Sequence, residues 1–129
     1  MTIIYIYTDP TPLARTKFSA GKVYNPRKTV LAKRVASLYM QNEFDRKKPY
    51  SEPIKVSIEF VFKRTKKDKS KERTWKSVKP DIDNLAKLYL DSGNGILWQD
   101  DNIICELNLK KMICGENEKP HVKISIHTL

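Results

Sequence analysis

The chain has 129 residues, of which 40% are hydrophobic and 31% charged, and its formal net charge is +10 at pH 7. This length suits a single domain around one core, over residues 1–129, and leaves little room for a second module. The longest apolar run, Ile3 to Tyr7, is far too short to span a bilayer or to serve as a signal peptide. We therefore expect a cytoplasmic protein without membrane contact.

The first part of the sequence predicts a strand followed by a helix. Residues 2–7 form a β-branched and aromatic run, which is typical of a strand. Residues 9–23 are punctuated by prolines and a glycine, which predict an irregular segment. Asn25 and Pro26 then suit the N-cap and the first position of a helix that runs to about Phe44. The apolar residues on one side of this helix are Val30, Leu31, Val35, Leu38 and Tyr39.

The remainder predicts three strands and a second helix. Residues 54–62 alternate between apolar and polar side chains, as a half-buried strand does, and residues 102–112 alternate in the same way. A short helix is expected over about residues 83–90. The last strand lies around residues 122–126 and is expected to pair with the preceding strand as a hairpin. The second helix should turn Leu85, Leu88 and Tyr89 inward and end at Gly93 or Gly95.

The resulting order of elements is βαβαββ. This order predicts an α+β fold in which a mixed sheet is covered by two helices.

Positive charge is concentrated between Lys63 and Lys79, where nine basic residues accompany two acidic ones. Such a run is often only a solvated loop. Here it directly precedes an acidic cluster, and a concentrated basic stretch is also typical of proteins that bind polyanions. We expect nucleic-acid contacts from Arg15, Lys17, Arg64, Lys66, Lys67, Lys69, Arg73, Lys76, Lys79 and Lys111.

The acidic cluster begins with Asp81 and Asp83, whose spacing of two places both carboxylates on one side of an extended segment. Lys87 follows Asp83 by one helical turn and shares its helix face. Asp100 and Asp101 come just before a strand, where the end of the sheet could bring them beside the start of the helix. Three or four carboxylates at one place are an unusual use of charge in a strongly basic protein.

Carboxylate oxygens are the natural ligands of Mg²⁺ and Mn²⁺. A metal ion held between aspartates and a phosphate can generate an attacking hydroxide and stabilise the charge of the transition state. Lys87 could stabilise the same charge or orient the attacking water.

Each of these residues also has a purely structural interpretation. Asp81 or Asp83 could be the N-cap of the helix, although this role cannot explain both. Asp100 and Asp101 could form a plain turn before the strand. Lys87 could be a surface lysine paired with Asp83.

This stretch resembles the RusA-like Holliday junction resolvases of bacteria and prophages. The matching pattern is a basic residue, then DxDNLxK, then a small helix, then WxDD, then an apolar strand that ends in lysine. In this chain these parts are Lys79, the segment Asp81–Lys87, the segment Trp98–Asp101 and the strand from Ile103 to Lys111. Beyond this stretch, the resemblance rests on the order of elements and on short segments around residues 12–15 and 24–26.

The resemblance implies a homodimer with two Mg²⁺-dependent sites, for which Mn²⁺ is a possible substitute. Each site would nick one of two opposed strands at a four-way DNA junction, so branched DNA is the expected partner. The resemblance also implies that Asp81, Asp83 and Asp101 are catalytic, metal-binding aspartates and that Lys87 is the catalytic lysine. Asp100 is the adjacent candidate ligand.

Two other functions remain open. A non-catalytic, basic nucleic-acid-binding protein would use the aspartates as caps and turns, but it has no reason to place four carboxylates beside its most basic segment. A nuclease could instead act on flaps, forks or RNA, because phosphate contacts carry no information on the shape of the substrate.

Overall fold

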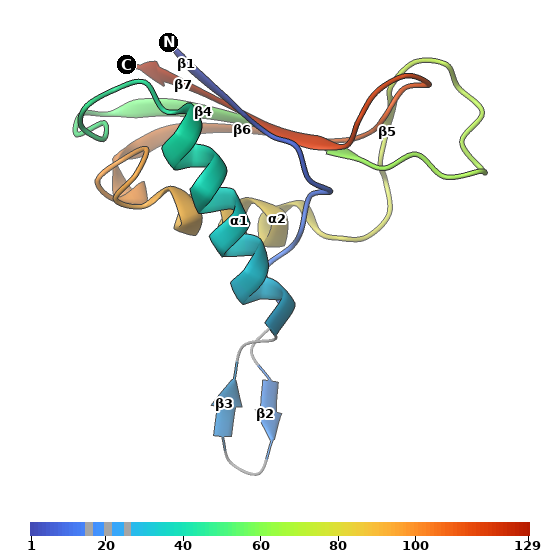
Figure 1. The fold of residues 1–129 in the computed structure, drawn as a ribbon, viewed down its shortest axis with the longest axis horizontal. Helices are drawn as coiled ribbons and strands as arrows, with labels where there is room; N and C mark the ends of the chain where they lie inside the picture. The colour runs from blue at the N-terminus through green and yellow to red at the C-terminus, as the bar shows by residue number, and fades with distance from the viewer. Residues whose placement is uncertain (15–16, 20–21, 25–26) are drawn as a thin grey trace.

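The computed structural model describes residues 1–14, 17–19, 22–24 and 27–129, in which two helices cover one face of a five-stranded mixed sheet (Figure 1). The predicted α+β fold is therefore confirmed. Three short strands, β2, β3 and β5, add to the predicted order. In chain order the elements are β1 (Thr2–Ile6), β2 (Lys17–Ser19), β3 (Lys22–Tyr24), α1 (Arg27–Glu43), β4 (Ile54–Phe62), β5 (Thr74–Trp75), α2 (Ile82–Gly93), the 3-10 turn η1 (Asp101–Ile103), β6 (Ile104–Ile113) and β7 (His121–Thr128).

Strand β4 occupies the middle of the sheet, whose strand order is β1-β7-β4-β6-β5. It runs parallel to β6 and antiparallel to β7, and β7 in turn pairs with β1. The prediction that the last strand forms a hairpin with the strand before it is therefore wrong, because β4 separates β6 from β7. The apolar side chains of β4 are buried, which favours a partner strand on each side. The connection over residues 114–120 is long enough to cross the end of one strand.

The two helices use different kinds of side chain against the core. α2 buries the predicted residues Leu85, Leu88 and Tyr89. α1 packs against α2 and β1, and its buried residues are Thr29, Ala36 and Met40. On the predicted apolar side of α1, Tyr39 is partly buried against the core, whereas the other four residues are 37–53% exposed: Val30, Leu31, Val35 and Leu38.

The end of α2 is fixed by the packing of Trp98, which is fully buried. A Cβ atom on Gly93 would lie 2.5 Å from Cζ2 of the Trp98 indole, so residue 93 has to be glycine for this contact to form. The indole Nε1 also donates a hydrogen bond to Asn94 Oδ1 at 3.0 Å. The helix ends at Gly93, as predicted, and the chain then follows a defined path to η1.

The segment between β1 and α1 is more regular than its composition predicts. Residues 17–19 and 22–24 form the antiparallel hairpin β2–β3, which projects beyond the first turn of α1 (Figure 1). The expected N-cap Asn25 and first helical residue Pro26 lie outside the described residues, as does Arg15. Neither α1 nor α2 has the length and apolar character needed to cross a membrane, and the described part of the chain contains no other α-helix.

Candidate active site

The first acidic residues of the candidate site lie at the start of α2. Asp81 is the N-cap residue, and its backbone carbonyl accepts a hydrogen bond from the Leu85 amide at 3.2 Å. Its carboxylate makes no capping hydrogen bond, so the side-chain capping role considered above is not used. Asp83 lies in the first turn and is exposed, and its Oδ1 accepts a hydrogen bond from the Asn84 amide at 2.9 Å. The carboxylate of Asp83 is thus presented to solvent at the N-terminal end of the helix.

One side of α2 carries alternating charges. Asp83, Lys87 and Asp91 follow one another at intervals of four residues, which places them along a single face. Lys87 is exposed, and among the described residues no ion pair joins it to Asp83. Asp91 forms an ion pair with Lys33 of α1, with a distance of 3.6 Å between Nζ and Oδ2. Asp91 is not among the residues predicted for the site, although its spacing of four from Lys87 was a usable signal.

The second acidic group lies in and before η1, which contacts α2. Asp100 is the N-cap of this turn, and its Oδ1 accepts a hydrogen bond from the Asn102 amide at 3.2 Å, so the turn interpretation is correct for Asp100. Partial burial, a hydrogen bond with Asp100 and the charges of Asp100 and Asp91 together raise the pKa of Asp101. Negative charge therefore accumulates where α2 meets η1.

The donor chemistry of these residues fits a hard divalent cation such as Mg²⁺, because all the candidates are carboxylates and those at the start of α2 are exposed. Burial contributes most to the raised pKa of Asp101, and the neighbouring carboxylates of Asp100 and Asp91 add a repulsion that a cation would relieve. In the described part of the chain, no three His, Cys, Asp or Glu side chains are already arranged to hold a metal ion. The two acidic groups thus lie on neighbouring elements, α2 and η1, without forming a preorganised metal site.

A depression of about 280 Å³ opens beside Asp81. The Leu13 amide donates a hydrogen bond to the Asn84 carbonyl at 2.9 Å, which holds the segment after β1 against the start of α2. Asn84, the asparagine of the DxDNLxK pattern, therefore lies at the wall of this depression. The lining residues are Pro12, Leu13, Lys79, Pro80, Asp81 and Asn84.

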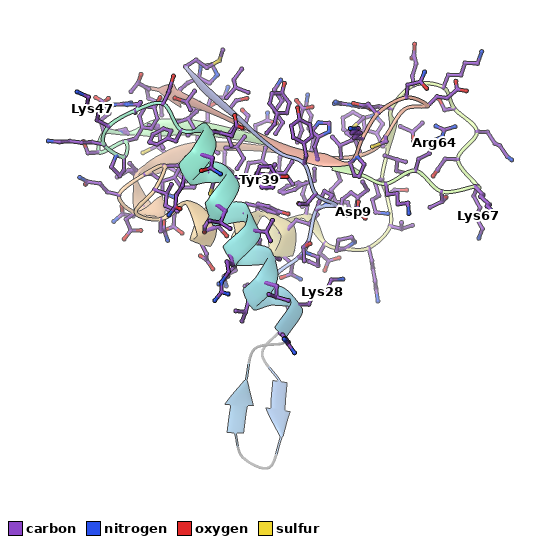
Figure 2. All side chains as sticks on the ribbon, in the orientation of Figure 1. Asp9, Lys28, Tyr39, Lys47, Arg64 and Lys67 are labelled. Carbon is purple, nitrogen blue, oxygen red and sulfur yellow. The ribbon has the colours of Figure 1, made fainter. Side chains whose placement is uncertain are left out.

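The basic loop of residues 63–79 projects from one end of the sheet, at the opposite end of the molecule from Lys47 (Figure 2). Lys66, Lys67 and Lys69 are exposed on it. Arg64 instead donates hydrogen bonds to the carbonyls of Ser70 and Asp68 within the loop. The carboxylate of Asp68 accepts hydrogen bonds from Thr65, which lower the pKa of Asp68.

Several of the other predicted DNA contacts already have partners within the protein. Arg73 forms ion pairs with Glu59 and Glu118, and these bonds raise the pKa of Arg73. The ammonium of Lys76 lies 4.9 Å from the centre of the Phe62 ring. Lys111 donates hydrogen bonds to the carbonyls of Val78 and Pro80. Of the remaining two predicted contacts, Lys79 is exposed and lines the depression beside Asp81, and Lys17 is the first residue of β2.

The model of the endodeoxyribonuclease RusA family matches residues 8–127. No curated protein gives a significant match to the sequence. The matched region includes both acidic groups and the basic loop, and it leaves out only a few residues at each end of the chain. The chain therefore belongs to the RusA endodeoxyribonuclease family.

Proposed function

We propose that the protein is a metal-dependent, structure-selective endonuclease of the cytoplasm that nicks four-way DNA junctions during recombination and repair. The observation that carries this proposal is the contact of α2, which carries Asp83 and Asp91, with η1, which begins at Asp101, in a chain whose net charge is +10. A protein that only binds DNA gains nothing from placing Asp100 and Asp101 near Asp91 of α2 in a chain this basic. Membership of an endodeoxyribonuclease family supports hydrolysis as the reaction.

In this proposal Asp81, Asp83 and Asp101 hold Mg²⁺, with Asp100 as an adjacent ligand and Mn²⁺ as a substitute. The bound ion supplies Lewis-acid stabilisation of the phosphoryl oxygens and an acidified water. Lys87 places an ammonium group on the same helix face as Asp83, where it can stabilise negative charge on the phosphate or orient water.

The basic loop supplies the phosphate contacts that bring the substrate to these residues. Such contacts are electrostatic and do not depend on sequence, so they fix the position of the DNA without selecting its bases. The exposed lysines Lys66, Lys67 and Lys69 suit this role best, since their ammonium groups face solvent.

We also propose a homodimer, because resolution of a four-way junction requires two paired incisions. The exposed apolar side of α1, formed by Val30, Leu31, Val35 and Leu38, supports this proposal. Apolar side chains gathered on one face of a helix are typical of a protein contact surface.

The proposal is tested by incubating the protein with an end-labelled four-way junction, with and without Mg²⁺. We expect metal-dependent nicks at symmetrical positions, and a loss of rate of about 1,000-fold in Asp83→Asn and in Asp101→Asn, since a metal ion contributes several kcal/mol to the transition state. Asp45→Asn is the matched control, because Asp45 is exposed and lies outside both acidic groups.

A panel of linear, flap, fork and RNA substrates separates junction specificity from general nuclease activity. Tight binding of the junction without cleavage in either Mg²⁺ or Mn²⁺ would favour the binding-protein interpretation. Undiminished cleavage by the two aspartate variants would instead contradict the assignment of the site.

A further inference from the structure

Lys111 is built into the protein differently from the other basic residues near the candidate site. It lies on β6 opposite Phe60, which is fully buried and whose ring packs against Tyr89 of α2, so Lys111 faces the helix-covered side of the sheet. Its Nζ donates hydrogen bonds to the carbonyl oxygens of Val78 at 2.7 Å and of Pro80 at 2.6 Å. Two of the three N–H groups of the ammonium are therefore used within the protein.

The segment held by Lys111 joins β5 to α2 and ends directly before Asp81. Its first residue, Lys76, donates a backbone hydrogen bond to the Lys111 carbonyl at 3.1 Å, so Lys111 contacts the segment at both ends. Residues 76–80 form neither helix nor strand, and Val78 is 64% exposed, so apolar burial contributes little to their placement. Pro80 has no N–H group, so its carbonyl is the only backbone hydrogen-bonding group it offers.

We propose that Lys111 is a positioning residue, which holds the backbone before Asp81 and so sets the placement of Asp81 and Asp83, rather than a contact to DNA phosphate. This inference rests on the proposed function for its catalytic consequence. The ammonium anchors the carbonyl of Pro80, and the next residue carries the first carboxylate of the candidate site. Since displacement of a reacting group by about 1 Å can cost about 100-fold in rate, a small shift of this segment is enough to disable the site.

The chain offers a matched control on the same strand. Lys110 is exposed and lies opposite Glu59, on the other face of the sheet. Lys111→Met and Lys110→Met each remove one positive charge from adjacent residues of β6, so only their positions differ.

We expect Lys111→Met to lower kcat for junction nicking about 100-fold, while its Kd for the junction without metal stays within about twofold of that of Lys110→Met. If Lys111→Met instead raises the Kd for the junction and leaves kcat at saturating junction unchanged, Lys111 contacts phosphate and the inference is overturned. Restoration of kcat by a lysine isostere is a second readout. With Cys105→Ser removing the exposed thiol, aminoethylation of Lys111→Cys rebuilds a side chain of the same length and charge, and Cys114 is protected by burial.

A measurement without DNA separates this inference from the proposed function. Backbone amide exchange over residues 76–83 should be faster in Lys111→Met than in Lys110→Met, with unchanged exchange in β4. If the unmodified protein does not nick any junction, the proposed function fails, and the exchange rates alone decide whether Lys111 holds the segment. Equal exchange in the two variants would overturn the inference that Lys111 holds this segment. If Lys111→Met does not fold, Lys111→Gln takes its place in both measurements.

Discussion

The contact between Gly93 and Trp98 shows how one residue without a side chain can fix the path to a functional site. The indole occupies the space that a Cβ atom at residue 93 would need. Trp98 is also only two residues before Asp100, so the packing of the indole determines where the η1 carboxylates begin. Trp98 is completely buried and so belongs to the core of the domain.

We expect Gly93→Ala to destabilise the fold by about 1–3 kcal/mol, because the added methyl group cannot be accommodated without moving the indole. Urea unfolding followed by circular dichroism measures this change. The control is the same substitution in a Trp98→Leu background, where the smaller side chain leaves room and the additional cost should fall below about 1 kcal/mol. An equal cost in both backgrounds would show that the contact with Trp98 is not the cause.

In the basic loop, the observed structure differs from what the composition predicts. Its sequence indicates a uniform run of positive charge, but the structure divides its basic residues into two groups. Arg64 and Arg73 bind acceptors within the protein and shape the loop, and the exposed lysines of residues 66–69 face solvent. Charge alone could not make this division, because it depends on the loop carbonyls that Arg64 reaches and on where Glu59 and Glu118 lie beside Arg73.

The exposed lysines should account for a measurable share of the salt dependence of DNA binding. In the double variant Lys66→Gln/Lys67→Gln, the slope of log Kobs against log salt should become shallower by about 1 for each lysine that contacts a phosphate. Lys47→Gln/Lys48→Gln is the control, since it removes the same charge from two exposed residues, of which Lys47 lies at the opposite end of the molecule from the basic loop (Figure 2). An equal change in both double variants would indicate a general effect of net charge.

For the whole molecule, the sequence predicted the elements and the fold class better than it predicted which strands pair with one another in the sheet. The alternation of β4 and the inward face of α2 are both present, because each follows from local periodicity. The position of β7 between β1 and β4 was missed, because a short turn favours a hairpin and only the buried character of β4 requires a second partner. Periodicity also identified an apolar side on α1 but could not tell which surface covers it.

The same limit applies to the candidate site. The spacing of Asp81, Asp83 and Lys87 was readable because all three lie within one helical turn and the residues just before it. The proximity of Asp91 to Asp101 and the contacts of Lys111 depend on how α2, η1 and β6 pack, and no local pattern contains that information.

The exposed side of α1 leads to a prediction for the assembled molecule. Light scattering at micromolar concentration should give twice the 15.0 kDa mass of the chain. Leu38→Glu should raise the dimer dissociation constant about 100-fold or more, because burying an unpaired carboxylate costs several kcal/mol. Ser51→Glu adds the same charge at an exposed residue outside α1 and should leave the mass unchanged. A monomeric unmodified protein would contradict the proposed dimer.

The pairing of β7 with both β1 and β4 has a consequence for synthesis on the ribosome. Val122, Ile124 and Ile126 are fully buried, so the sheet lacks an interior strand until residues 121–128 have left the exit tunnel. The β1–β7 pairing joins residues that are far apart in the chain, which makes early folding of a nascent fragment unfavourable. We expect a chain stalled before residue 121 to remain without a native sheet, and thus without the packing that places η1 against α2. Translation itself would then delay the appearance of DNA-cutting activity until the sheet can close.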